Sequence, residues 1–239
     1  MHSCGQSVRS PWPEHLLMAG MILVGALSVI GPVVAADGTD GQITASGDAE
    51  VGKLLFSDDF SSSKSGWEWS DSAATYTNGS YLLTVFSPNY WTYYLNPQIS
   101  PADFVVEVEA TKKSGPNDSI LGLLVRRVGP DDYSGPDSFY AFLISCDGYY
   151  DIEEYNDGDW VTSPKWIKSE AIKTGSGTNL LKVVARKDKL SFYANGEKLG
   201  DFVDDTLASG GFGLYAESPP SEGNVVIAYD NFKVWSIKE

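Results

Sequence analysis

The side chains that could do chemistry in this chain are mainly carboxylates and aromatic rings. Both histidines, His2 and His15, and one of the two cysteines, Cys4, lie near the N-terminus, which leaves Cys146 as the only later residue of either type. If the N-terminal segment is removed, a Ser-His-Asp triad, a Cys-His pair and a zinc site of His and Cys ligands are excluded. A metal would then need oxygen ligands, which favours calcium.

The N-terminal segment 1–36 predicts export. An arginine and two histidines precede an uncharged apolar run over 16–34, and Ala35 and Ala36 come just before Asp37. This pattern is typical of a secretory signal peptide. An uncleaved membrane anchor, in contact with the membrane through this segment alone, is the alternative, because the run approaches the roughly 20 residues that span a bilayer. Either way, we expect the rest of the chain to be secreted or held at the cell surface.

Composition indicates one packed domain that does not bind nucleic acid. The 239 residues include 17 Lys and Arg against 32 Asp and Glu, a formal charge of −15, whereas affinity for a phosphate backbone needs clustered cations. Hydrophobic residues make up 42%, enough for a core. We predict a flexible Gly-, Asp-, Ser- and Thr-rich spacer over 37–52 and the folded domain over 53–239.

Turn signals predict an all-β fold. Asn78-Gly79, Asp147-Gly148, Asp157-Gly158 and Asn195-Gly196 lie next to β-branched or aromatic runs, and such dipeptides favour two-residue type I′ hairpin loops. No stretch keeps a helical apolar period over three turns. We therefore expect two packed antiparallel sheets in a jelly-roll sandwich, preceded only by the N-terminal signal or anchor helix. The strand-like runs cover 54–57, 73–77, 81–86, 104–111, 120–128, 139–146, 149–155, 180–186, 190–194, 211–215 and 225–235.

One predicted hairpin carries both rings and acids. With Asp147-Gly148 as a two-residue loop, one face of the hairpin holds aromatic and acidic side chains, and the other holds plain core residues. Rings that stack on pyranose C–H faces, beside carboxylates that accept hydroxyl protons, are typical of a sugar-binding surface. A half-solvated edge hairpin is an equally good interpretation. The predicted ligand contacts on this face are Tyr140, Tyr149, Asp151, Glu153 and Tyr155.

A second aromatic cluster spans residues 89–94. Strand alternation places Trp91 and Tyr93 on one side and Tyr90 on the other, so one side can be core while the other lines a surface. Trp91 and Tyr93 are therefore further candidate ligand contacts, with a structural role as the alternative because large rings dominate cores.

Five segments share their order and spacing with a known group of proteins: 56–60 followed by Gly66-Trp67, 179–184, 190–196, 204–214 and 229–234. They resemble the concanavalin A-like lectin/glucanase superfamily, and within it the exported laminin-G-like or 3-keto-disaccharide hydrolase-like domains. The resemblance covers residues 54–238. It implies a jelly roll whose first and last strands pair and whose concave sheet often meets carbohydrate.

The resemblance says less about activity. Superfamily glucanases carry a Glu-x-Asp-x-x-Glu strand motif, which neither 151–154 nor 107–109 matches. A glycosidase of another design would need two carboxylates roughly 5 to 9.5 Å apart, for which Asp151 and Glu153 are the candidates. Superfamily members often hold a structural ion near the paired end strands.

That region supplies the candidate metal ligands Asp58, Asp59 and Asp230, with a calcium ion as the predicted occupant. The alternative is that these acids end strands and face water, in which case no cofactor is needed.

Three functions follow as hypotheses. The first is an exported, non-catalytic domain that binds a polysaccharide or glycan through an aromatic and acidic concave face. The second is a sugar hydrolase resembling the 3-keto-disaccharide group, with carboxylates as acid and base. The third is a surface structural or adhesion domain with a protein partner, in which the rings are core.

Overall fold

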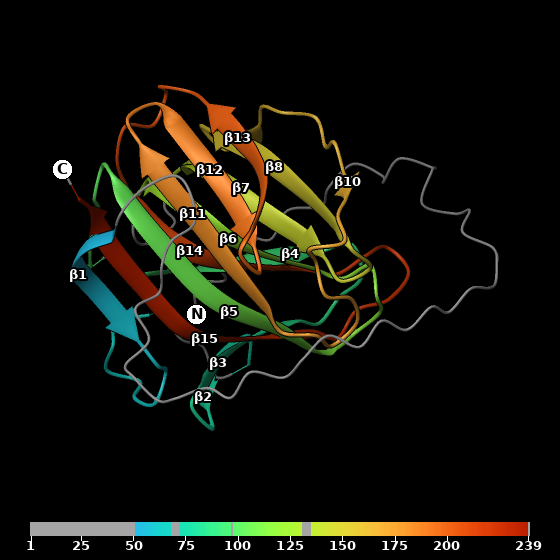
Figure 1. Ribbon diagram of the computed structural model, residues 1–239. Helices are drawn as coiled ribbons and strands as arrows, with labels where there is room; N and C mark the ends of the chain where they lie inside the picture. Colours follow the sequence, from blue (N-terminus) through green and yellow to red (C-terminus); the bar gives the residue numbers. More distant parts are fainter. Residues whose placement is uncertain (1–50, 68–71, 97, 131–134, 239) are drawn as a thin grey trace, which may run out of the picture.

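The computed structural model describes residues 51–67, 72–96, 98–130 and 135–238, and its described elements are all strands (Figure 1). The predicted N-terminal segment and nearly all of the predicted spacer lie outside these residues. Among the described residues no helix is long and apolar enough to cross a membrane. Two antiparallel sheets pack as a sandwich, which confirms the predicted fold class.

The first sheet has eight strands. Its order begins at β13 and ends at β2, and β1 pairs with the C-terminal half of β15. The predicted pairing of the first and last strands is therefore confirmed. In sheet order the strands are β13 (Glu197–Val203), β12 (Lys189–Ala194), β11 (Asn179–Arg186), β5 (Phe104–Ser114), β15 (Val225–Ile237), β3 (Ser80–Val85) and β2 (Ala74–Thr77), with β1 (Val51–Asp58) beside β15.

The second sheet has seven strands and carries the candidate site on its outer face. In sheet order the strands are β10 (Ile167–Lys168), β8 (Tyr149–Asn156), β7 (Ser138–Ser145), β6 (Ile120–Val128), β14 (Gly211–Glu217) and β4 (Trp91–Asn96), with β9 (Asp159–Trp160) beside β8. Four strands were not predicted from the sequence, namely β4, β9, β10 and β13.

The core lies between the inner faces of the two sheets. Rings meet across the interface: Phe104 of β5 lies 4.9 Å from Phe212 of β14, and Phe142 of β7 lies 5.3 Å from Phe192 of β12, between ring centroids. The buried Tyr229 hydroxyl of β15 accepts a hydrogen bond from the backbone N–H of Gly122 in β6 at 3.1 Å. Aromatic packing and this bond hold the sheets together.

Three of the four predicted two-residue hairpin loops are confirmed. Asn78-Gly79, Asp157-Gly158 and Asn195-Gly196 each separate one pair of opposed residues, and both residues of each loop have positive φ. Asn, Asp and Gly tolerate that conformation best, which is why these dipeptides locate the turns.

The prediction for the fourth loop, Asp147-Gly148, is wrong by one residue. Ser145 lies opposite Tyr149, so the loop has three residues, and among them only Gly148 has positive φ, at 104°. The backbone of Cys146 is held from outside the hairpin. Its N–H donates to Ser119 O at 2.9 Å, and its carbonyl accepts from Gly175 N at 2.7 Å. Because its backbone is bonded there, Cys146 does not pair with β8, and the register of β7 against β8 differs by one residue from the predicted one.

Candidate concave-face site

The register shift changes which side chains share a face. Asp151, Glu153 and Tyr155 lie opposite Leu143, Ala141 and Phe139, respectively. All six therefore point to the outer face of the seven-stranded sheet, because residues directly opposite in a ladder share a face. Phe139, Ala141 and Leu143 are among the plain core residues that the predicted two-residue loop places on the face opposite the two acids.

Tyr140 is the predicted ligand contact that the shift removes from this face. It is fully buried in the core between the sheets, beside Phe202. Its hydroxyl donates to the carboxylate of Asp204 and accepts from Leu207 N at 3.0 Å. Burial, followed by the bond to Asp204, raises the pKa of Tyr140. A one-residue slip moves a side chain to the other face of a strand, and this is the reason the assignment fails.

Six aromatic rings from five strands meet on the outer face. Stacked pairs have centroids 5.5 Å apart for Trp91 and Tyr93, 5.6 Å for Trp91 and Tyr215, and 4.8 Å for Phe139 and Tyr155. Trp160 of β9 packs edge-on against Trp91, Phe139 and Tyr155. We call these six residues the aromatic cluster. Such contacts stabilise a ring arrangement beyond simple burial.

The cluster shows that this face is concave. Neighbouring strands lie about 4.8 Å apart, so β4 and β8, four spacings apart in this sheet, would be separated by about 19 Å in a flat sheet. The ring centroids of Trp91 on β4 and Tyr155 on β8 are nevertheless only 5.9 Å apart. The sheet must therefore curve around its outer face. In the middle strands, Gly122 and Gly213 leave space that leucine side chains fill: a Cβ on Gly122 would lie 2.6 Å from Leu143 Cδ2, and one on Gly213 would lie 3.1 Å from Leu95 Cδ2.

Exposure divides the cluster into a floor and a rim. Trp91, Tyr93, Phe139 and Tyr215 are buried, whereas Tyr155 and Trp160 are half-buried, as is the predicted contact Tyr149 nearby on β8. Burial, followed by the charges of Asp137 and Asp159, raises the pKa of Tyr155, so its phenol stays protonated and can donate. The half-buried rings are the part of the cluster that a ligand can reach.

The carboxylates of this face differ in what they do. Asp151 is buried and accepts hydrogen bonds from the backbone N–H of Ile152 at 2.8 Å and of Lys165 at 2.6 Å. It thereby fixes the segment after β9 against β8. Glu153 is 1% exposed, and Glu217 on β14 is 2% exposed and accepts from the Tyr215 hydroxyl. Three buried carboxylates thus lie on this face, and Glu153 and Glu217 are the two that do not bind backbone N–H groups in the way that Asp151 does.

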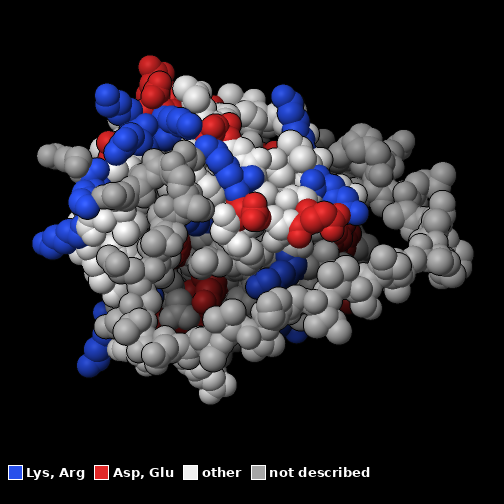
Figure 2. All heavy atoms as spheres, viewed as in Figure 1, with Lys and Arg blue, Asp and Glu red and all other residues white. Residues whose placement is uncertain are grey.

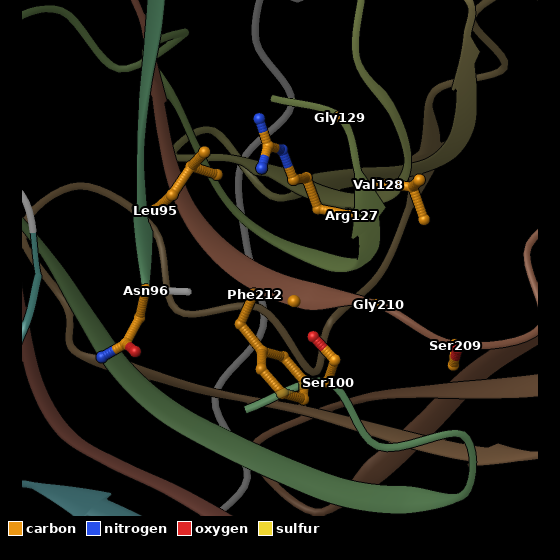
Figure 3. Close-up of a pocket in the computed structure, with 10 residues that line it drawn as sticks. Leu95, Asn96, Ser100, Arg127, Val128, Gly129, Ser209, Gly210 and Phe212 are labelled. Carbon is orange, nitrogen blue, oxygen red and sulfur yellow. The ribbon is translucent and has the colours of Figure 1, made fainter. Parts of the chain in front are cut away.

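A polar pocket of about 330 Å³ lies at one end of this face, where β4, β6 and β14 meet (Figure 3). Arg127, buried at its wall, forms an ion pair of 2.6 Å with Asp137 and donates to Pro130 O at 2.5 Å. The Tyr93 hydroxyl donates to the other oxygen of Asp137, which links the pocket to the aromatic cluster. The pocket is lined by Leu95, Asn96, Ser100, Arg127, Ser209 and Phe212.

Gly129 lets the ion pair form. A Cβ at this position would lie 2.0 Å from Asp137 Oδ1, and the backbone φ is +156°. Any side chain here would therefore push the carboxylate away from Arg127. The result is a buried ion pair that fixes the wall of the pocket.

Sequence reasoning missed several members of this site. Tyr215 and Phe139 lie in apolar runs that look like ordinary core, and Arg127 and Asp137 come together only through the fold. Trp160 could have been found, because it follows the Asp157-Gly158 turn and so returns alongside Tyr155.

The predicted metal ligands lie where β1 meets β15. Asp58 is opposite Phe232 and accepts from Phe60 N at 2.8 Å, and Asp59 accepts from the Ser61 hydroxyl at 2.6 Å. The second oxygen of Asp58 is buried without a hydrogen-bond partner. Among the described residues, however, no group of three acidic, His or Cys side chains converges closely enough to hold a metal ion. These side chains alone do not form a calcium cage, and an ion here would need backbone oxygens.

Three solved structures share this architecture. The carbohydrate binding module CBM66 from Bacillus subtilis matches with a TM-score of 0.56 and 18% identity, over 72% of this chain and 96% of that chain. A Bacillus subtilis protein of galectin-like fold matches with a TM-score of 0.62 and 13% identity, over 80% and 99%. The Bacillus licheniformis β-glucanase matches with a TM-score of 0.58 and 12% identity, over 79% and 100%.

This chain has the concanavalin A-like fold. The resemblance found in the sequence is thereby confirmed at the level of architecture. At these identities the likeness shows the concanavalin A-like fold alone, and function has to be argued from the site. No protein-family model matches the chain, and no curated protein matches it.

Proposed function

We propose that this domain is exported and binds carbohydrate on its concave face, without catalysis. The half-buried rings of Tyr149, Tyr155 and Trp160 offer stacking surfaces. At the end of the face, the exposed residues Ser100 and Ser209 line the pocket and offer hydroxyl groups. The aromatic cluster carries the proposal, because rings from five strands converge on one concave surface beside buried carboxylates. Similarity to a carbohydrate binding module and to β-glucanases supports a carbohydrate ligand.

Removal of one accessible ring tests the proposal. Trp160→Ala is expected to weaken binding of a responding polysaccharide about tenfold, the loss that corresponds to one stacking contact. The measurement is a glycan array followed by a tryptophan-fluorescence titration of the mature domain. Trp235→Ala is the matched control, since Trp235 is also half-buried but belongs to the eight-stranded sheet. Equal losses in the two variants, or a flat response to every glycan, contradict the proposal and favour a protein partner.

A sugar hydrolase is the second candidate, and the buried carboxylates favour it. Glu153 and Glu217 lie on different strands of the same concave face, where a general acid and a base would be needed. Asp151 fits such a role less well, because both of its oxygens already accept backbone N–H groups. Glu153→Gln and Glu217→Gln would abolish turnover and preserve binding if this candidate is correct. If the wild-type domain releases no reducing sugar from any glycan that it binds, the hydrolase is excluded.

The mass of the intact protein isolated from its native host tests whether the predicted signal peptide is removed. Cleavage after Ala35 or Ala36 predicts a mature N-terminus at Ala36 or Asp37. A membrane-bound product that retains Met1 would instead indicate the uncleaved anchor.

A further inference from the structure

A second cleft lies away from the concave face, between the free edges of the two sheets. It has a volume of about 450 Å³, within the range of small-molecule sites, and both sheets line it. In Figure 1 the strand β13 lies beside β8 and β10 at this edge. The lining residues on which the argument rests are Tyr150, Ile152, Thr162, Ser163, Gly200 and Phe202.

The floor of the cleft is apolar, and it stays open because residue 200 is a glycine. The Tyr150 hydroxyl donates to Leu199 O at 2.7 Å and so ties β8 to β13 across the gap between the sheets. A Cβ on Gly200 would meet only the Cδ1 atom of Ile152, at 3.6 Å. Gly200 therefore leaves space beside Ile152 at the floor of the cleft.

The rim of the cleft carries fixed polar groups. On the outer face of the eight-stranded sheet, Asp201 accepts from the Ser191 hydroxyl at 2.6 Å and forms ion pairs with Lys198 at 3.0 Å and Lys189 at 3.2 Å, which holds the edge strand β13 in place beside the cleft. Partial burial would raise the pKa of Asp201, but these bonds outweigh it and lower the pKa to about 2. On the opposite wall, Thr162 accepts from Glu154 N at 3.0 Å through its hydroxyl oxygen, which keeps its proton for donation.

Exposed apolar side chains cluster around the same cleft. Val161 is 59% exposed, Ile167 52% and Val203 65%, and each either lines the cleft or directly adjoins a lining residue. Single exposed apolar residues are ordinary, but a group around a cavity marks a binding surface.

We propose that this edge cleft is a second carbohydrate site, which takes one or two pyranose units of a neutral glycan. A pyranose has an apolar C–H face that suits the floor and a ring of hydroxyl groups that suits the rim. The chain carries a net charge of −15, so an anionic ligand is disfavoured. The hydroxyl residues Thr162 and Ser163, which also line the cleft, disfavour a purely apolar ligand.

Gly200→Leu tests this site without disturbing the fold. Gly200 lies in an edge strand outside the left-handed region of φ, and a larger residue fits a strand better than glycine does. The new side chain projects into the cleft and fills it. Glu197→Leu is the matched control, since it places the same side chain on β13 away from the cleft lining. Thermal unfolding of both variants verifies that the fold is intact.

The probes are neutral hexasaccharides of glucose, mannose, galactose and fructose, followed by isothermal titration calorimetry. We expect the wild-type domain to bind at least one probe, and Gly200→Leu to weaken one class of site at least tenfold while Glu197→Leu leaves it unchanged. Trp160→Ala should affect only the concave-face site, so the two proposals fail or succeed separately. Binding unaffected by Gly200→Leu, equal losses in Glu197→Leu, or no response to any probe overturns the edge site. Binding of a peptide at the cleft, together with binding of no hexasaccharide, would also overturn the proposed edge site.

Discussion

At the scale of single residues, Arg126 is the largest fully buried side chain among the described residues. It is fully buried at the end of β6, in a left-handed backbone conformation with φ of 52°. Its guanidinium donates to three carbonyl oxygens, at 2.9 Å to Leu207, 3.0 Å to Ala102 and 2.5 Å to Lys187. Burial lowers its pKa. One cation thus holds three loops together at one end of the sandwich.

Arg126→Met should destabilise the domain strongly. The substitution keeps most of the side-chain volume but leaves buried carbonyl groups without their donors, so we expect a loss of about 3 kcal/mol in the free energy of unfolding. Urea denaturation measures it, with Arg186→Met at an exposed position as the control. A difference of less than about 1 kcal/mol between the two variants would contradict this role.

At the scale of elements, the pairing of β1 with β15 brings acidic residues together. Burial, and then the charges of Glu109, Asp59 and Asp58, raise the pKa of Asp230. The folded state therefore binds this proton more tightly than the unfolded state does. The stability that Asp230 contributes is fully present below its unfolded pKa and is lost as pH rises through the raised folded pKa.

Asp230→Asn should therefore stabilise the domain at neutral pH and have little effect near pH 3. The bond that Asp230 accepts from Asn231 N, at 2.7 Å, can be kept by the amide oxygen of asparagine. Melting temperatures measured across pH test this, with Asp205→Asn at an exposed position as the control.

The same variant tests the predicted calcium ion. Since no three carboxylates of the described residues converge there, we expect millimolar calcium to leave the melting temperature unchanged. A calcium-dependent rise of several degrees that Asp230→Asn removes would instead establish a calcium site.

At the scale of the whole molecule, net charge is the dominant electrostatic feature. On the face shown in Figure 2, basic and acidic side chains are interspersed and form no single basic stripe. The 15 excess negative charges repel one another and destabilise the folded state.

Salt should therefore stabilise the folded domain. Raising sodium chloride from about 10 mM to about 300 mM shortens the Debye length from roughly 30 Å to below 8 Å, so we expect the melting temperature to rise by a few degrees. Potassium chloride should act equally, because the effect is screening and not ion binding. A fall in melting temperature, or a response to only one salt, would contradict the interpretation.

The amino-acid sequence determined the features that depend on local chemistry. Asn-Gly and Asp-Gly dipeptides located three hairpins, because few other residues adopt two consecutive positive φ angles. The alternating apolar runs predicted most strands of an all-β sandwich. The shortage of His and Cys restricted the chemistry available to the site.

Only the tertiary structure decided which residues form the site. The register of β7 against β8 depends on bonds from Cys146 to Ser119 and Gly175, which are distant in the sequence. That register moved Tyr140 into the core. Likewise, Trp91 meets Tyr155 only because the sheet curves, and curvature arises from strand order and packing, which no local pattern encodes.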